Sequence, residues 1–161
     1  MSIQIPSLHV SNSSEVKGKA EVFITSRKDA AHTGTFGVGL SLRFNPALDA
    51  YPAGSLAFTI SLSDSLKCQV KATTIEQINT YGKHNPTVYI TGRCDVKPQE
   101  DGPKAVGCRY WLMIADNARK PSPEATPDVI GFLIYDRNGV RMAYGTGPVK
   151  AGDIVVAASG E

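Results

Sequence analysis

Hydrophobic side chains alternate with polar or small ones along much of the middle of the chain. Residues 37–44 (GVGLSLRF) and 55–63 (SLAFTISLS) place their apolar side chains at every second position, and residues 68–74 and 88–96 continue this period. Successive side chains of a β-strand point to opposite faces of the sheet. The pattern therefore predicts half-buried antiparallel strands.

Two later segments lack this alternation. Residues 110–115 (YWLMIA) and 129–135 (VIGFLIY) are apolar at nearly every position. Their short length and their β-branched and aromatic residues favour strands over helices. Strands that are apolar on both faces are typical of central strands covered on each side. We therefore expect both segments, and Trp111 with them, to lie in the core.

Turn-forming residues separate these segments. Asn138-Gly139 follows Arg137 and favours a hairpin with a type I′ turn, because that turn needs positive φ angles. Residues 145–148 (GTGP) predict another turn, and residues 74–80 fit either a weak helix or a strand. Irregular loops are expected at residues 45–54, 81–86 and 117–128, the last of which contains three prolines.

The number and spacing of the strands indicate the fold class. About nine to ten short strands joined by turns are typical of β-sandwiches and barrels. The chain has 161 residues, of which 42% are hydrophobic, enough to build one core without disulfide or metal support. We predict a single-domain antiparallel β-sandwich over residues 1–161, with a closed β-barrel as the alternative.

Charge and hydropathy exclude two classes of partner. The formal net charge is +2, and no stretch of basic residues is longer than two. Nucleic-acid binding needs a denser basic surface, so we expect no nucleic-acid partner. The chain shows no apolar stretch long enough for a membrane-spanning helix and no signal peptide. We therefore expect no membrane partner, and either a cytoplasmic location or export without a cleavable signal.

The three cysteines raise the question of a disulfide. Cys94 and Cys108 flank a turn at Gly102-Pro103, and a symmetric hairpin would place them directly opposite each other. Opposed residues have Cβ atoms about 4.5–5.5 Å apart, which is near disulfide geometry. The alternative is a pair of buried thiols in a reducing compartment. Cys68 is expected to be an isolated core thiol.

Acidic and amide side chains form one candidate metal site. Asp116, Asn117, Asp128 and Asp136 follow or precede strands that should be neighbours. Converging oxygen ligands of this kind suit Ca²⁺, and no other cofactor is indicated. The alternative is that these side chains close turns by bonding nearby backbone groups.

The expected loops carry the candidate ligand-binding residues. Tyr51, Tyr81, His84 and Asn85 lie on polar connections, where a tyrosine ring can stack on a sugar or contact a protein partner. The alternative is that they are ordinary exposed loop residues. No Gly-x-Ser-x-Gly elbow or other catalytic motif is present, so no catalytic residue is predicted and an enzyme is disfavoured.

The C-terminal part of the chain resembles a known group of domains. Its strand and turn motifs are TGR, RYWLMIADN, DVIGFLIYD, NG and GDIVV, at residues 91–93, 109–117, 128–136, 138–139 and 152–156. Residues 91–157 thereby resemble the immunoglobulin-like and accessory β-sandwich domains of secreted bacterial proteins. The resemblance implies a non-catalytic module.

Together these observations predict a binding or structural module that recognises a glycan or a protein through its loops. One alternative is a small-molecule-binding β-barrel protein or enzyme with a pocket at the barrel mouth. That alternative requires Arg43, Arg93, Arg109 or Tyr89 to point inward. Another is a self-assembling component of a larger particle, that is, a homo-oligomer.

Overall fold

The protein consists of β-strands joined by turns and loops. A computed structural model describes residues 14–24, 34–45, 47–62, 67–81, 86–98, 104–117 and 128–158. The strands are β1 (Ser14–Ile24), β2 (Gly34–Phe44), β3 (Ala53–Leu62), β4 (Lys67–Ala72), β5 (Gln77–Tyr81), β6 (Thr87–Pro98), β7 (Ala105–Ala115), β8 (Val129–Tyr135) and β9 (Arg141–Ala158). The predicted all-β class is confirmed, and of residues 74–80, which fitted a helix or a strand, residues 77–80 belong to strand β5 and residues 74–76 precede it. Within the described ranges, no helix has the length and apolarity that crossing a membrane would require.

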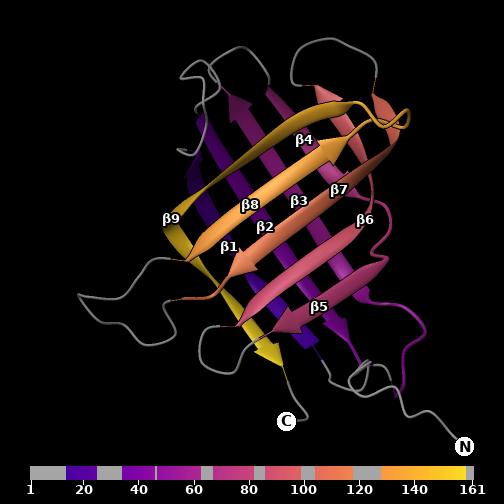
Figure 1. The fold of residues 1–161 in the computed structure, drawn as a ribbon, viewed down its shortest axis with the longest axis vertical. Helices are drawn as coiled ribbons and strands as arrows, with labels where there is room; N and C mark the ends of the chain where they lie inside the picture. The colour runs from indigo at the N-terminus through magenta and orange to yellow at the C-terminus, as the bar shows by residue number, and fades with distance from the viewer. Residues whose placement is uncertain are drawn as a thin grey trace, which may run out of the picture.

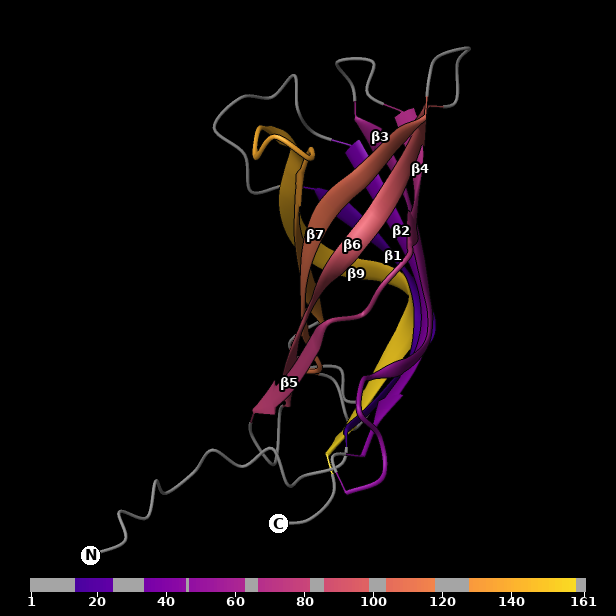
Figure 2. The same cartoon turned by 90° about the vertical axis from the view of Figure 1, so that its right-hand side faces the viewer.

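The strands close into a barrel. Their order is β4-β3-β2-β1-β9-β8-β7-β6-β5, every pair is antiparallel, and β4 also pairs with β6. Eight strands therefore form a closed barrel, and β5 extends it as an edge strand beside β6. The barrel is flattened into two layers, and β1 to β4 lie behind β5 to β8 in Figure 1. Figure 2 shows the two layers edge-on. The predicted antiparallel all-β fold is thus confirmed. Its strands close into the β-barrel that was the stated alternative.

Strand β9 closes one side of the barrel. Its first half pairs with β8, from Arg141 to Pro148, and its second half pairs with β1, from Val149 to Ala158. The turn predicted at residues 145–148 is wrong, because these residues lie within the strand. The glycines are needed there for close approach: a Cβ on Gly147 would overlap the backbone oxygen of Phe23.

Strand β6 closes the other side by changing partners. Its residues 87–91 pair with β5, and its residues 94–98 pair with β4. The corner between them is held by Tyr110, whose hydroxyl donates a 2.9 Å hydrogen bond to the backbone oxygen of Thr74. Burial raises the pKa of Tyr110, so the hydroxyl keeps its proton.

The core lies between the two layers. Phe36 stacks on Phe132 with ring centroids 4.4 Å apart, and Phe58 and Tyr110 complete the aromatic cluster. Alternation along β2, β3, β4 and β6 places the apolar side chains inward, as predicted. In β7 the buried positions are Cys108, Tyr110, Leu112 and Ile114, whereas Trp111 lies on the outer surface and is only partly buried. The prediction that Trp111 lies in the core is wrong.

The predicted hairpin after β8 is present, but its turn differs from the expected one. The backbone N–H of Gly139 donates to the oxygen of Asp136, so Arg137 and Asn138 are the central residues of the turn. Gly139 follows them with a φ of 82°. This is a three-residue loop that ends in a glycine bulge, not a two-residue type I′ turn.

Candidate functional site

Large side chains collect on the outer surface of the layer formed by β5 to β9. Strand register aligns them in two neighbouring rows. The first row is Gln77, Thr91, Trp111, Leu133 and Tyr144. The second row is Asn79, Tyr89, Met113, Gly131 and Thr146. We call these two rows the aromatic face.

The aromatic face is open to solvent within the part of the chain that the structure describes. Figure 1 looks directly onto it, and no described strand lies over it. The rings of Tyr89 and Trp111 lie 5.7 Å apart, and the guanidinium carbon of Arg141 lies 4.0 Å from the ring centroid of Tyr144. All three aromatic side chains are half-buried, so each offers part of its ring to solvent.

A hollow borders the aromatic face at its β5 end. It has a volume of about 480 Å³ and is lined by Gln77, Asn79, Thr87, Tyr89, Thr91 and Trp111. Amides donate and accept hydrogen bonds, and hydroxyls do the same. The hollow therefore combines two aromatic rings with four side chains that can bond to the hydroxyl groups of a ligand.

This combination of rings and hydrogen-bonding side chains suits contact with a ligand. Aromatic side chains contribute a large apolar contact area, and patches of this kind on a soluble protein mark interaction sites. Among the described residues, those that line the hollow carry amide, hydroxyl and aromatic side chains and include no cysteine, histidine or carboxylate.

The loop residues predicted to bind a ligand are only partly described. Tyr51 is 74% exposed on the connection between β2 and β3, and Leu48 on the same connection is 83% exposed. The side chain of Tyr81, together with His84 and Asn85, lies outside the described residues. Asn45 orders the connection locally, since its backbone oxygen accepts hydrogen bonds from the N–H groups of Leu48 and Asp49. Tyr51 thus remains a second candidate position for ligand contact.

The four residues predicted to bind calcium do not gather at one place. Asp116, Asn117 and Asp128 lie at one end of β7 and β8, whereas Asp136 lies at the opposite end of β8. Asp136 accepts hydrogen bonds from the N–H groups of its own turn, at 2.8 and 2.9 Å. Among the described residues no group of three His, Cys, Asp or Glu side chains is placed to hold a metal ion.

Asp116 and Asp128 instead bond to the backbone of neighbouring strands. Both are buried, at 3% and 4% exposed. An oxygen of Asp116 accepts a hydrogen bond from the N–H of Val156, and one of Asp128 accepts from the N–H of Asn117. Buried carboxylates with such bonds connect the end of β7 to β9 and to the start of β8.

The three cysteines are all buried and free in the structure. Cys94 and Cys108 are directly opposite each other in the β6–β7 ladder, as the symmetric hairpin predicted. A disulfide between them stays a prediction. Burial raises the pKa of Cys68 to about 11 and that of Cys94 to about 12, and it also raises the pKa of Cys108.

These pKa values predict thiol chemistry that depends on unfolding. We expect the native protein to resist a disulfide exchange reagent at about pH 8, because only the thiolate reacts. Above the ordinary pKa of 9.0 the unfolded chain loses thiol protons that the folded protein keeps. The free energy of unfolding should therefore fall as the pH rises above that value, until the folded protein also loses these protons at about pH 11 for Cys68 and about pH 12 for Cys94.

Thiol titration and unfolding curves at several pH values measure both effects. If the protein, denatured without a reducing agent, releases three titratable thiols, Cys94 and Cys108 are both reduced. If it releases only one, the disulfide between them is supported. Rapid labelling of the native protein would contradict the burial of the thiols.

The residues that a barrel-mouth pocket would require lie elsewhere. Arg43 is exposed, and the side chains of Arg93 and Arg109 are 52% and 54% exposed. Tyr89 belongs to the aromatic face. The inward positions of the described strands are instead apolar.

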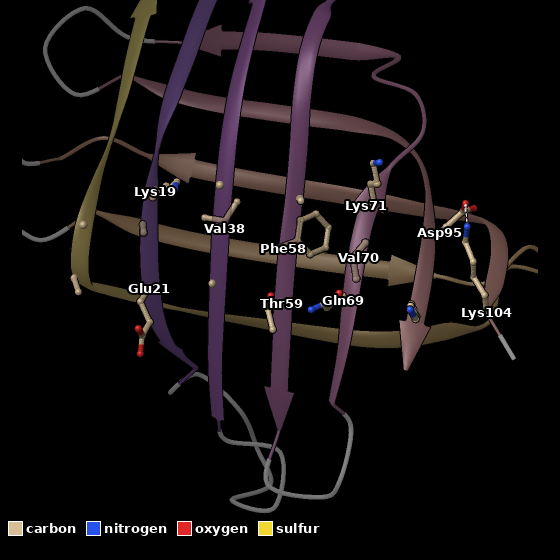
Figure 3. A pocket seen from close by; sticks show the side chains of 17 residues that line it. Lys19, Glu21, Val38, Phe58, Thr59, Gln69, Val70, Lys71, Asp95 and Lys104 are labelled. Atoms are coloured by element: carbon tan, nitrogen blue, oxygen red, sulfur yellow. Dashed lines mark ion pairs between the residues drawn. The ribbon is translucent and has the colours of Figure 1, made fainter. Parts of the chain in front are cut away.

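The opposite layer carries a second hollow on its outer surface, with a volume of about 970 Å³ (Figure 3). Small residues of β2 and β3 form its floor, including Gly37, Gly39 and Ala57. Long polar side chains stand around this floor: Lys19, Glu21, Gln69, Lys71, Lys97 and Lys104. Because this hollow offers charge but no aromatic ring on its outer surface, the aromatic face is the stronger candidate.

Sequence reasoning missed the aromatic face. Its signal was present, because the outward positions of β7 and β8 include Trp111, Met113 and Leu133. In a sequence, however, an outward apolar side chain is equally typical of a strand that a further layer covers.

No family model, curated protein or solved structure matches this chain.

Proposed function

We propose that this protein is a non-catalytic binding module that recognises a glycan through the aromatic face. The observation that carries the proposal is the row of Trp111, Leu133 and Tyr144 beside Tyr89, open to solvent on a closed barrel. Sugar rings have an apolar face that packs on aromatic side chains and a rim of hydroxyl groups that need hydrogen bonds. The aromatic face supplies rings, and Gln77 and Asn79 supply amides beside them.

The rigid sheet suits this role. Each of these side chains stands on a strand paired on both sides or, for β5, on one side. A binding surface built on paired strands is preorganised, so little ordering is needed when a ligand binds. A protein partner would use the same apolar patch, but the amide and hydroxyl lining of the hollow favours a ligand rich in hydroxyl groups.

The test is saccharide binding by the full chain and by two single variants. Trp111→Ala removes the central ring of the aromatic face, and Tyr51→Ala removes an exposed ring from a loop outside it. We expect the chain to bind members of an oligosaccharide panel and Trp111→Ala to weaken binding at least about tenfold, as loss of a central aromatic contact does. Tyr51→Ala should leave affinity unchanged.

Isothermal titration calorimetry gives the affinities, and thermal unfolding shows that each variant is folded. If Tyr51→Ala weakens binding and Trp111→Ala does not, recognition takes place through the loops and the aromatic face is not the site. If no saccharide of the panel binds, glycan recognition is ruled out for those sugars and a protein partner becomes the better hypothesis.

A further inference from the structure

A third row of outward side chains follows the aromatic face along the strands, and it is basic. Register places Arg93, Arg109, Tyr135 and Arg141 side by side across β6, β7, β8 and β9. This row neighbours the row that contains Trp111. A hollow of about 500 Å³ lies here, and we call it the arginine hollow. It is lined by Arg93, Val106, Gly107, Arg109, Tyr135, Asp136, Arg137 and Gly139.

Carboxylates only partly balance the positive charge around the arginine hollow. Glu76 pairs with two arginines at once, at 3.5 Å from Nε of Arg93 and 3.1 Å from an Nη of Arg109. Asp136 is engaged by backbone N–H groups of its own turn. Arg137 has no ion-pair partner among the described residues. Three guanidinium groups of the hollow therefore stand against two carboxylates.

The chemistry of these cations is specific. A guanidinium group is planar, keeps its charge at any physiological pH and donates paired hydrogen bonds that match a carboxylate or a sulfate. It is also weakly hydrated, so it binds anions well beside an apolar surface. Gly107, which lines the hollow, has a φ of 69°, and a Cβ added to it would lie 3.9 Å from Cβ of Arg137.

The distance between the rings and the cations suits one small ligand. Trp111 and Arg109 are two residues apart on the same face of β7, which corresponds to about 7 Å. Leu133 and Tyr135 have the same spacing on β8. A sugar stacked on Trp111 would therefore place an acidic substituent within reach of the arginine hollow.

We infer that the ligand of the aromatic face is an acidic saccharide whose carboxylate or sulfate group binds in the arginine hollow. This inference rests on the proposed function and adds the chemical class of the ligand. The rings and amides provide affinity for the sugar, and the arginines select for the anion.

The experiment compares matched charged and neutral ligands. Oligogalacturonate and its methyl ester differ only in the carboxylate charge, and a heparin oligosaccharide and its desulfated form differ in sulfate. We expect at least one charged member to bind about tenfold more tightly than its neutral counterpart. This preference should shrink when NaCl is raised from about 50 mM to about 300 mM, because salt screens exposed charges.

Variants assign the effect to the arginine hollow. Arg109→Gln combined with Arg137→Gln should lower affinity for the charged ligand to that of the neutral one and leave neutral binding unchanged. Lys19→Gln removes one cation from the opposite layer and should change neither affinity. Trp111→Ala should weaken both ligands, which identifies the stacking contact separately. Thermal unfolding midpoints within about 2 °C of the wild type establish that the arginine and lysine variants are folded.

Three outcomes would overturn the inference. If charged and neutral ligands bind with equal affinity, and Trp111→Ala weakens the binding of both, the ligand needs no anionic group. The inference then fails and the proposed function stands. Charge selectivity that survives the arginine substitutions and falls in Lys19→Gln moves the anion site to the other layer. Binding of polyglutamate with no binding of any saccharide overturns the proposed function as well.

Discussion

Replacing Gly147 by alanine should lower the free energy of unfolding by about 3 kcal/mol. A Cβ at this position would overlap the backbone oxygen of Phe23 and lie 3.2 Å from Cγ1 of Val22. Relief would require β9 to move away from β1 at the point where the barrel closes. Overpacking of a rigid site costs about 1–3 kcal/mol, and here the obstacle is backbone, which places the cost at the upper end.

Gly39→Ala is the matched control for this prediction. Gly39 lies on the outer surface of β2, and the nearest atom to an added Cβ is 3.7 Å away. Since alanine restricts the unfolded chain more than glycine does, Gly39→Ala should be neutral or stabilising by about 0.5 kcal/mol. Urea unfolding followed by fluorescence measures both changes. Equal stability of the two variants would contradict the close passage of β9 over β1.

Replacing Asp116 by alanine should destabilise the protein by about 2–3 kcal/mol. Asp116 is 3% exposed, and its carboxylate accepts a hydrogen bond, 3.2 Å long, from the N–H of Val156 in β9. Hydrogen bonds to charged groups contribute about 1.5–3 kcal/mol, and alanine removes this buried acceptor. The end of β7 would then be held less firmly to β9.

Two further variants separate the hydrogen bond of Asp116 from other effects of the substitution. Asp116→Asn keeps an acceptor oxygen and should lose less stability than Asp116→Ala. Asp136→Ala removes hydrogen bonds from an exposed turn, where water replaces them, and should cost about 1 kcal/mol. Urea unfolding again provides the measurement. If Ca²⁺ instead raises the thermal midpoint of the wild type and not that of Asp116→Ala, the metal site predicted from sequence is supported.

Much of the strand pattern was predictable because it depends on local chemistry. Alternation in residues 37–44 and 55–63 matches the inward positions of β2 and β3. The position of Cys94 opposite Cys108 followed from the symmetry of a hairpin about its turn. The hairpin after β8 was found from its Asn-Gly pair, but the turn type depended on hydrogen bonds of Asp136.

Two errors arose from features that local sequence does not record. Residues 145–148 read as a turn because glycine and proline favour turns, yet β9 continues through them since its two halves pair with different strands. The sequence also predicts Asp128 and Asp136 at one end of the sheet. Their separation along β8 follows from strand length and direction, which the spacing of acidic residues does not reveal.

The candidate site also has features that the sequence predicts and features that only the tertiary structure defines. The sequence by itself determined that β7 and β8 are strands with large apolar side chains on both faces, because that depends on residue type and period. Only the tertiary structure decided that one of those faces is the core and the other is open to solvent. The choice depends on where β1 to β4 pack, and no local pattern in β7 or β8 records it. For the same reason the arginines beside Trp111 form a candidate site only because strand register aligns four strands.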